Sequence, residues 1–166
     1  LISGMQMDLS TFDSTNPKNI QSFNDWKELD NYIYFVAGSV GEFWTRVTSQ
    51  KTNAIDDSIM DEMVLLGIDF GKSLQLTNII RDITSDLRNG RCYIPATTLD
   101  FYQVKTYDLL SNSNIPQTED LLKHLINHTL NYFISADKYI RMLPKNHLRL
   151  RLSILIPVMI GLQTLE

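Results

Sequence analysis

Four polar side chains recur along the stretch "QLTNIIRDITSDLRNGRCYIP", which runs from Gln75 to Pro95 and has a helical pattern of apolar residues. At about 100° per residue, Gln75, Asn78, Asp82 and Asp86 fall within a stripe about 80° wide, with an apolar face beside it. A solvent-exposed face of an amphipathic helix is one interpretation of this pattern. Such a face usually carries lysine and glutamate, whereas these short side chains hold their oxygen atoms close to the backbone.

The two aspartates of this stripe are spaced to share a cation. Asp82 and Asp86 are four residues apart, so their carboxylates lie about 6 Å apart along the helix axis and repel each other. A hard cation would remove this repulsion, and Mg²⁺ typically binds one or two carboxylates together with phosphate oxygens. Arg81, Arg88 and Arg91 surround the pair and could hold a phosphate. The stripe and the loop after it therefore predict a diphosphate–magnesium site.

The composition is that of one packed domain. The chain has 166 residues, of which 43% are hydrophobic, and a net charge of −4, which disfavours nucleic-acid binding. Cys92 is the only cysteine, so no internal disulfide can form and a reducing compartment is expected. The chain begins within the helix-like run "LISGMQMDL" and ends at "GLQTLE" without a stop signal. We therefore expect a single domain, residues 1–166, that is truncated at both ends.

Helical periodicity dominates and sustained strand alternation is missing, so the predicted fold class is all-α. We expect helices over residues 22–47, from Asp56 to about Leu87, over 118–142 and over 148–165, with Ser22 or Asn24 as the first N-cap. Residues 88–104 and 111–120 are predicted loops, and glycines 67 and 71 predict a kink. The apolar run 152–162 is too short to span a bilayer and predicts a buried core helix, with a membrane-surface segment as the alternative.

Two further groups of polar residues have simpler interpretations. Asp57 and Asp61 repeat the spacing of the aspartate pair, but acids favour helix N-termini, so we interpret them as a solvated helix start. His124 and His128 are four residues apart and lack an evident third ligand, so a solvated helix face is expected there.

The stripe also carries a family resemblance. "LQLTNIIRDITSDLRNGRCYIP" resembles the second aspartate-rich motif of squalene/phytoene synthases, QxxNxxRDxxxD followed by GRxYxP. The matching residues are Gln75, Asn78, Arg81, Asp82, Asp86, Gly90, Arg91, Tyr93 and Pro95. Ser85 departs from the pattern, because many members have an acid there. "YIYFVAGSVGEFW" resembles the YCYxVAGxVG helix of the family, and "LISGMQMDL", with Asp8, resembles the segment before it, so the resemblance covers essentially the whole chain.

The resemblance implies a partial isoprenoid synthase fold, a helical bundle around an apolar cavity. It implies head-to-head condensation of two isoprenoid diphosphates, farnesyl or geranylgeranyl, through a cyclopropyl diphosphate to a squalene- or phytoene-type hydrocarbon. Mg²⁺ is the expected cofactor. A squalene product would also require NADPH, although the sequence contains no dinucleotide-binding fingerprint. The first aspartate-rich motif of the family lies upstream of the segment with which this chain begins, so the fragment alone is expected to be inactive.

The resemblance also implies a role for each matching residue. Asp82 and Asp86 are the expected metal ligands and catalytic residues, with Asn78 as a further ligand. The expected substrate-binding residues are Gln75, Asn78, Arg81, Arg88, Arg91, Gly38 and Gly41. Tyr32 and Tyr34 are expected catalytic residues that line the cavity, and a buried tyrosine with a satisfied hydroxyl is the alternative for Tyr34. Gly38 and Gly41 leave room for a lipid tail or a neighbouring helix.

The sequence is also compatible with two other functions. Some proteins of this fold family are inactive and act as assembly or scaffold proteins, and a helical protein-binding module is a simpler alternative still. "VGEFW" and the motif from Phe70 onward resemble bacterial squalene-synthase-like members more than phytoene synthases. The expected partners are isoprenoid diphosphates, with no nucleic acid and no obligate protein partner. A cytoplasmic location is expected, and a lipid product is compatible with peripheral membrane contact.

Overall fold

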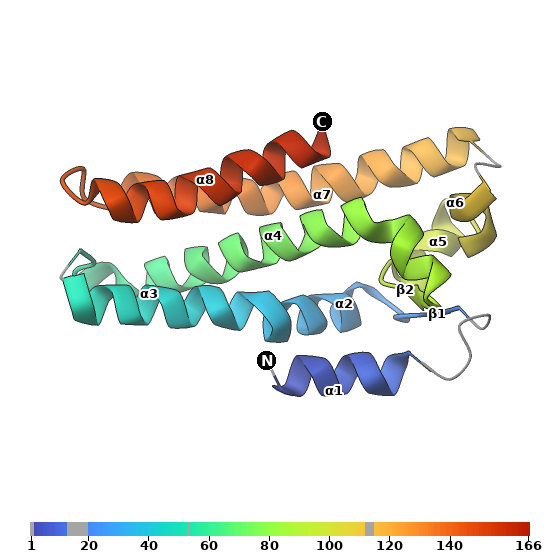
Figure 1. The fold of residues 1–166 in the computed structure, drawn as a ribbon, viewed down its shortest axis with the longest axis horizontal. Coiled ribbons are helices and arrows are strands. Elements are labelled where there is room, and N and C mark those ends of the chain that lie inside the picture. The colour runs from blue at the N-terminus through green and yellow to red at the C-terminus, as the bar shows by residue number, and fades with distance from the viewer. Residues whose placement is uncertain (1, 13–19, 53, 112–114) are drawn as a thin grey trace.

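The computed structural model describes residues 2–12, 20–52, 54–111 and 115–166, which form a bundle of helices (Figure 1). Its elements are α1 (Ile2–Thr11), β1 (Gln21–Ser22), α2 (Trp26–Ile33), the π-helix η1 (Tyr34–Gly38), α3 (Ser39–Thr52), the 3₁₀-helix η2 (Asp57–Ile59), α4 (Met60–Arg88), β2 (Arg91–Cys92), α5 (Ala96–Phe101), α6 (Thr106–Ser111), α7 (Ile115–Met142) and α8 (Leu148–Leu165). The predicted all-α class is confirmed.

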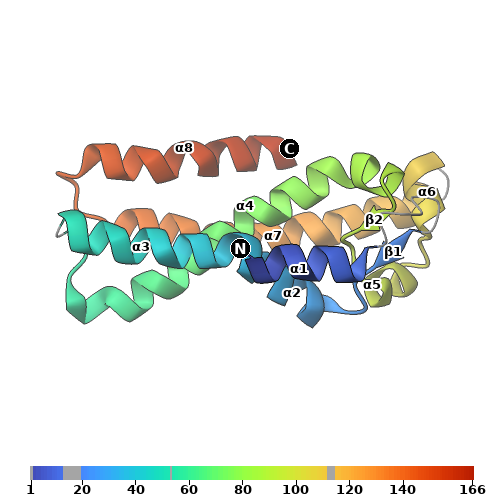
Figure 2. The same ribbon diagram turned by 60° about the horizontal axis from the view of Figure 1, so that its bottom comes forward.

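The long helix α4 is the centre of the bundle. It contacts α3 and η1 on one side and α7 and α8 on the other (Figure 1). Figure 2 shows α8 at one edge of the bundle and α1 beside η1 and α2. The polar stripe predicted for residues 75–86 therefore lies on the helix that contacts most of the other elements.

Within the described residues, strand structure is limited to β1 and β2, which the sequence did not predict. They pair in parallel, with Gln21 opposite Arg91 and Ser22 opposite Cys92. Gly90 makes this pairing possible because it ends α4 in the left-handed region, with a φ of 79° that favours glycine. The backbone N–H of Gly90 donates to the carbonyl oxygen of Leu87 at 3.1 Å. This turn directs Arg91 back along the end of α4.

Several predicted helix boundaries differ from those observed. The N-cap of α2 is Asp25, not Ser22 or Asn24, because the Asp25 carboxylate accepts a hydrogen bond from the backbone N–H of Glu28 at 2.9 Å. Asn24 instead donates its own backbone N–H to the Glu28 carboxylate at 2.8 Å. Asp56 caps the short η2 turn, and α4 begins four residues later.

The predicted loop 88–104 contains the six-residue helix α5, and a further short helix, α6, follows it. Pro95 precedes α5 as its N-cap, a place where the missing N–H of proline breaks no helical hydrogen bond. The helix predicted to begin at residue 118 begins earlier, at Ile115. The last predicted helix is confirmed as α8.

Glycines bring α3 and α4 into close contact and do not interrupt α4. A Cβ atom added to Gly41 would lie 1.8 Å from the carbonyl oxygen of Gly67, and one on Gly71 would lie 2.3 Å from that of Ala37. The two backbones therefore touch, and only glycine fits at these positions. α4 continues through Gly67 and Gly71 as one helix, and the predicted kink at these residues stays a prediction.

The predicted burial of residues 152–162 is wrong for most of this run. Ile154, Val158 and Gly161 face the bundle because α8 packs on α4 and α7 along one side only. The exposed apolar residues of α8 are Leu148, Leu152, Leu155, Ile156, Met159, Ile160 and Leu162. By length and composition alone, α8 could cross a membrane, and 17% of it is buried in the bundle. One apolar face of α8 is thus open.

Candidate active site

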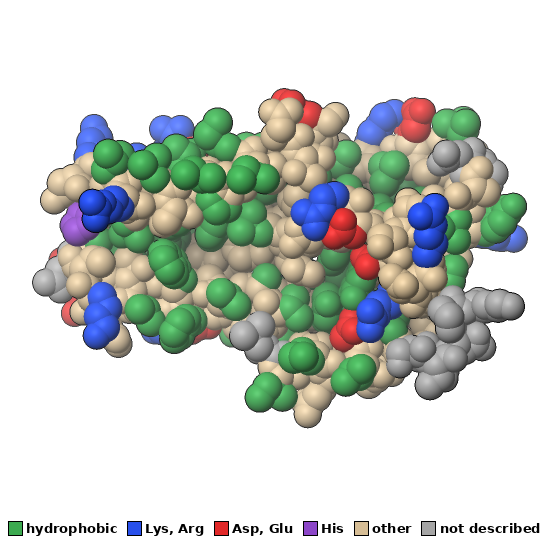
Figure 3. Space-filling model, viewed as in Figure 1, with side chains coloured by type: hydrophobic (Ala, Val, Ile, Leu, Met, Phe, Trp, Pro, Cys, Tyr) green, Lys and Arg blue, Asp and Glu red, His purple; other side chains and the backbone are tan. Residues whose placement is uncertain are grey.

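The polar stripe of α4 lines a cavity of about 260 Å³. The lining residues are Gln75, Asn78, Ile79, Arg81, Asp82, Asp86 and Tyr93. The structure therefore brings the four stripe residues together with Arg81, as the helical spacing predicted. Figure 3 shows acidic and basic side chains gathered near the C-terminal end of α4, with hydrophobic side chains along α3 and α8 on the same face.

Asp82 is neutralised within the chain by its sequence neighbour. The Nε and Nη2 atoms of Arg81 lie 2.8 and 2.6 Å from the two carboxylate oxygens of Asp82, a two-point ion pair. Hydrogen bonds from Arg81 lower the pKa of Asp82. Both side chains remain partly exposed, at 52% and 41%, so they are accessible to a ligand in the cavity.

Asp86 lies in a different environment, one turn further along α4. Among the described residues, none forms a hydrogen bond or ion pair with its side chain. Burial raises the pKa of Asp86, and the negative charges of Asp82 and Asp8 raise it further, whereas Arg91 opposes the rise. Asp86 is therefore the carboxylate of this site that lacks a partner and would gain most from a cation.

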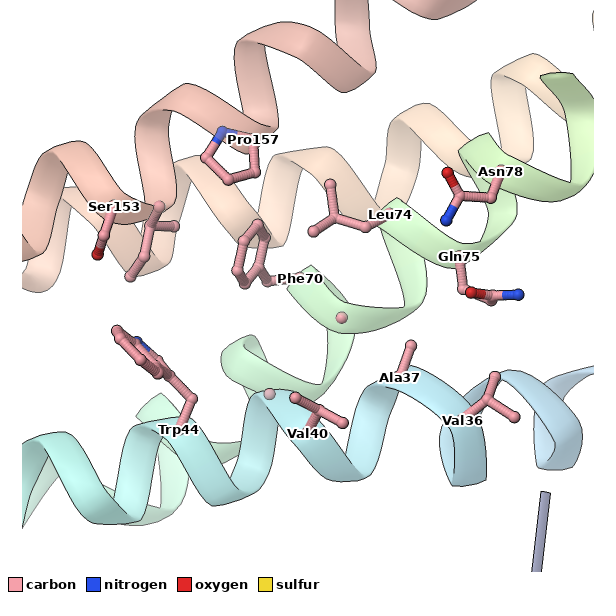
Figure 4. Close-up of a pocket in the computed structure, with 13 residues that line it drawn as sticks. Val36, Ala37, Val40, Trp44, Phe70, Leu74, Gln75, Asn78, Ser153 and Pro157 are labelled. Carbon is pink, nitrogen blue, oxygen red and sulfur yellow. The ribbon is translucent and has the colours of Figure 1, made fainter. Parts of the chain in front are cut away.

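An apolar groove of about 400 Å³ meets the polar cavity (Figure 4). η1 and α3 form one wall of the groove, α8 forms the opposite wall, and α4 lies between them. The lining residues are Val36, Ala37, Val40, Gly41, Trp44, Phe70, Gly71, Leu74, Gln75, Asn78, Ser153, Ile154 and Pro157. Gln75 and Asn78 line both the groove and the polar cavity, so the two spaces adjoin at these residues.

A third space lies between α4 and α8 and also reaches this junction. It measures about 250 Å³ and is lined by Leu74, Thr77, Asn78, Arg81, Pro157, Ile160, Gly161 and Thr164. Asn78 thus borders all three spaces, and Arg81 borders two of them. The polar cavity on α4 therefore has a largely apolar space on each of two sides: the groove, and the space between α4 and α8.

Several predicted site residues do not line the polar cavity. Arg91 lies beside Asp86 and Tyr93 in a small neighbouring space. Arg88 is exposed at the end of α4 and does not line the polar cavity, although helical spacing puts it on the same side of α4 as Arg81, about 120° from the centre of the stripe. Tyr34 donates its hydroxyl to the carboxylate of Glu42 at 3.2 Å and does not line the cavity. Burial and Glu42 raise the pKa of Tyr34.

The two predicted space-making glycines have different surroundings. Gly41 lines the apolar groove and also touches the backbone of Gly67 in α4, so it has both open space and a neighbouring helix beside it. A Cβ atom on Gly38 would meet Tyr34 and Ile68 at 3.1 and 3.2 Å. Gly38 is therefore part of the packing between η1 and α4 and not of the groove.

Tyr32 lies behind the cavity wall and not in it. It is 6% exposed, and its ring stacks on that of Tyr93 with centroids 5.3 Å apart and an interplanar angle of 22°. Burial raises the pKa of the Tyr32 hydroxyl. Tyr93 is the tyrosine that faces the polar cavity. Its hydroxyl donates to Asp8 of α1 at 2.7 Å.

The sequence carried signals for Tyr93 and Asp8, because both match the family segments, but no role followed from those matches alone. The groove residues Trp44, Phe70 and Leu74 had no polar signal at all. The two histidines are half-buried against Trp26, with ring centroids 6.1 Å away for His124 and 4.3 Å for His128, so the predicted solvated face is only partly correct. Asp57 and Asp61 are exposed near the start of α4, as expected.

The sequence of this chain is similar to those of known isoprenoid synthases. A family model described as squalene/phytoene synthase matches residues 1–166. The 15-cis-phytoene synthase of Synechocystis sp. is 31% identical over 150 residues, which are 88% of this chain and 42% of that protein. Phytoene synthase 1 of Arabidopsis thaliana is 31% identical over 140 residues, which are 83% of this chain and 30% of that protein. The chain thus spans less than half the length of these curated relatives.

Solved structures support the fold. The squalene synthase HpnC from Alicyclobacillus acidocaldarius superposes with a TM-score of 0.72 at 18% identity, over 99% of this chain and 58% of that one. A dehydrosqualene synthase in complex with ligand gives a TM-score of 0.70 at 20% identity, over 97% of this chain and 52% of that one. The predicted isoprenoid synthase fold is confirmed. Because the family model matches the whole sequence, this chain belongs to the squalene/phytoene synthase family.

Proposed function

We propose that the protein containing this chain condenses two isoprenoid diphosphates head to head into a squalene- or phytoene-type hydrocarbon. The observation that carries this proposal is that the polar cavity adjoins the apolar groove at Gln75 and Asn78. A substrate with a charged head and a long apolar tail needs both spaces in contact. Membership of the squalene/phytoene synthase family supports the reaction class.

The residues of the polar cavity fit Mg²⁺. Asp86 has a raised pKa and lies one turn from a second carboxylate, so this donor set carries uncompensated negative charge. Asn78, Asp82 and Asp86 supply oxygen atoms only, which suits a hard cation that also binds phosphate oxygens. When bound, the metal would neutralise charge on the diphosphate and so assist its departure.

The arginines of the site would bind the diphosphate itself. Arg81 projects into the cavity with a planar guanidinium that can bind phosphate oxygens at two points. Arg91 lies beside Asp86 and Tyr93 in a small space next to that cavity. Arg88 is exposed and does not line the polar cavity, so we give it no role in binding here. Tyr93, with Tyr32 packed behind it, would form the wall next to the diphosphate.

The groove would hold the isoprenoid tail and keep water from the reacting carbon atoms. Its surface is mainly aliphatic and aromatic, with Trp44, Phe70 and Leu74 opposite Pro157 (Figure 4). Departure of the diphosphate leaves an allylic cation that water would quench, so an apolar lining favours carbon–carbon bond formation. In the proposed sequence the double bond of the second substrate attacks this cation, and loss of a proton closes the ring of a cyclopropyl diphosphate. A second ionisation and rearrangement follow, and the final cation loses a proton or, for squalene, accepts hydride from NADPH.

The proposed substrate is a C15 or a C20 diphosphate, and the experiment below distinguishes the two. The curated relatives named above are phytoene synthases, whereas the solved structures are squalene and dehydrosqualene synthases. A C30 product that forms only with NADPH would identify squalene. We further propose a cytoplasmic location with peripheral membrane contact, because the hydrocarbon product partitions into lipid.

The test uses the full-length protein. It is incubated with farnesyl and geranylgeranyl diphosphate separately, with Mg²⁺, with and without NADPH, and the hydrocarbons are extracted. A C30 or C40 product that disappears in Asp82→Ala supports the proposal and identifies the substrate. No product from either substrate, with folded protein and metal present, would favour the alternative of an inactive assembly or scaffold protein.

A further inference from the structure

The carboxylate of Asp8 connects α1 to the polar cavity by two contacts. One oxygen accepts the hydroxyl proton of Tyr93 at 2.7 Å. The other lies 3.0 Å from Nη2 of Arg91. The side chain of Asp8 is 18% exposed, so both contacts are made in a partly desolvated place where charge-assisted hydrogen bonds are strong.

Both partners of Asp8 lie next to Asp86. Asp86, Arg91 and Tyr93 line one small space at the end of α4, and Tyr93 also lines the polar cavity. Asp86 forms no ion pair with any described residue, while the charge of Arg91 acts on it. Arg91 therefore lies near the carboxylates of both Asp8 and Asp86, and in the structure it forms its ion pair with Asp8.

Packing of α1 does not depend on this carboxylate. The ring of Phe12, just after α1, packs edge to face on Phe23 and Tyr93, with centroids 5.4 and 5.1 Å away. Gly4 lies against Val36, which a Cβ atom would approach to 2.5 Å. These apolar contacts hold α1 against η1, so a change at Asp8 that keeps its size should act locally.

We propose that Asp8 is a positioning residue for the diphosphate end of the site: it holds Arg91 and Tyr93 at the cavity and keeps Arg91 from pairing with Asp86. The proposal rests on the proposed function, because it assumes that this cavity binds a diphosphate. Without the Asp8 carboxylate, Arg91 pairs with Asp86, and both residues are then lost to the ligand.

The experiment measures binding of inorganic pyrophosphate with Mg²⁺ to the full-length protein by calorimetry. Asp8→Asn keeps the size of the side chain and an oxygen acceptor for Tyr93 but removes the charge. Asp137→Asn is the matched control, because Asp137 also pairs with an arginine, Arg141, at 2.6 Å on the exposed surface of α7. Thermal unfolding of each variant checks that α1 stays folded.

We expect Asp8→Asn to weaken pyrophosphate binding about 10-fold and to raise the Mg²⁺ concentration required, with Asp137→Asn unchanged. Asp8→Glu, which keeps the charge, should recover part of the loss. In an Arg91→Ala background, Asp8→Asn should have little further effect, since the two residues act as one unit. Binding of farnesol, which has a tail but no diphosphate, should be the same in wild type and Asp8→Asn.

Unchanged pyrophosphate affinity in folded Asp8→Asn would overturn the proposal, as would additive losses with Arg91→Ala. Equal weakening of farnesol and pyrophosphate binding would also overturn it, because it would indicate general disturbance of the fold. Failure of the proposed function gives a different result: wild type would then bind pyrophosphate with Mg²⁺ no better than Asp86→Ala and form no hydrocarbon.

Discussion

Asp82 and Asp86 lie one turn apart on the same face of α4, yet their carboxylates are compensated in opposite ways. Asp82 has a two-point ion pair with Arg81 and a lowered pKa. Asp86 has a raised pKa, caused first by burial and then by the charge of Asp82. The repulsion that the spacing predicted is therefore relieved at Asp82 by Arg81 and persists at Asp86. A cation would act chiefly on Asp86.

The first prediction concerns the stability of the metal-free protein. The folded protein binds the Asp86 proton more tightly than the unfolded chain, so ionisation of Asp86 reduces the free energy of unfolding as pH rises above the ordinary aspartate range. We expect Asp86→Asn to raise Tm at neutral pH and the gain to shrink at acidic pH, where Asp86 is protonated. Thermal unfolding with a chelator, from about pH 3 to about pH 8, measures it.

Asp82→Asn provides the contrast for that experiment. The pKa of Asp82 is lowered, so its ionised form stabilises the folded state at neutral pH, and this contribution is lost as pH falls. The exposed pair contributes little, so Tm should fall slightly or stay the same. A rise of Tm in Asp82→Asn equal to that in Asp86→Asn would contradict the assigned difference between the two carboxylates.

The second prediction concerns Mg²⁺. Asp86→Asn should lower hydrocarbon formation by the full-length protein by about 100-fold, because it removes a proposed ligand of the Mg²⁺ that would neutralise the departing diphosphate. It should also abolish any rise in Tm that Mg²⁺ and pyrophosphate cause together in wild type. Arg88→Gln is the control, because Arg88 is exposed and does not line the polar cavity. A strong loss in Arg88→Gln would show that the exposed end of α4 contributes to binding after all.

The third prediction concerns the contact between α3 and α4. A Cβ atom on Gly67 would lie 2.3 Å from Oγ1 of Thr45, which is buried and bonded to both Gly41 and Tyr139. Gly67→Ala should therefore lower the free energy of unfolding by about 1–3 kcal/mol, despite the better helix propensity of alanine.

Gly38→Ala is the matched control for this prediction. Its Cβ would meet Tyr34 and Ile68 at 3.1 and 3.2 Å, distances that small side-chain shifts can relieve. Urea unfolding of the two variants should place Gly38→Ala within about 1 kcal/mol of wild type. Equal destabilisation by both substitutions would contradict the close backbone contact at Gly67.

The fourth prediction concerns the apolar groove. Val40 lines it, whereas Phe43, on the same helix and 67% exposed, does not. Val40→Trp should displace about two methylene groups of a bound tail, which at about 0.8 kcal/mol each corresponds to a loss of about 10-fold in affinity for the isoprenoid. Phe43→Trp should have no effect, and pyrophosphate binding should be equal in both variants. Weakened pyrophosphate binding in Val40→Trp would mean that the groove and the polar cavity are not separable.

Helical spacing was sufficient to predict the site residues that lie on α4. It could not predict the site residues that come from other elements. Gln75, Asn78, Asp82 and Asp86 share a face because α4 is regular through them. Arg88 lies seven residues after Arg81, so spacing alone could not show that it is exposed at the end of α4 and outside the cavity. Asp8 and Tyr93 lie 85 residues apart in the sequence, so no local pattern could predict their hydrogen bond. The paired strands β1 and β2 are also non-local, which explains why strand signals were missed.

The apolar composition of α8 could not reveal which of its faces would be covered. Apolar residues occur all round this helix, and only its contacts with α4 and α7 decide that Ile154 and Val158 are buried while Ile156 and Ile160 are open. The short helices α5 and α6 were missed for a different reason. Six residues are too few for a periodic pattern to stand out beside the breakers Gly90 and Pro95.

The π-helix η1 gives one continuous helical segment two working surfaces. Tyr32 and Gly41 are nine residues apart, and nine steps of about 100° would put them on opposite sides of a regular α-helix. In the structure Tyr32 packs in a cluster with Leu76 and Ile79 of α4, and Gly41 touches Gly67 of the same helix. The wider turn between Tyr34 and Gly38 absorbs the difference in phase. One surplus backbone residue, which no side-chain pattern in the sequence marks, thus keeps both the tyrosine wall of the cavity and the glycine wall of the groove in register with α4.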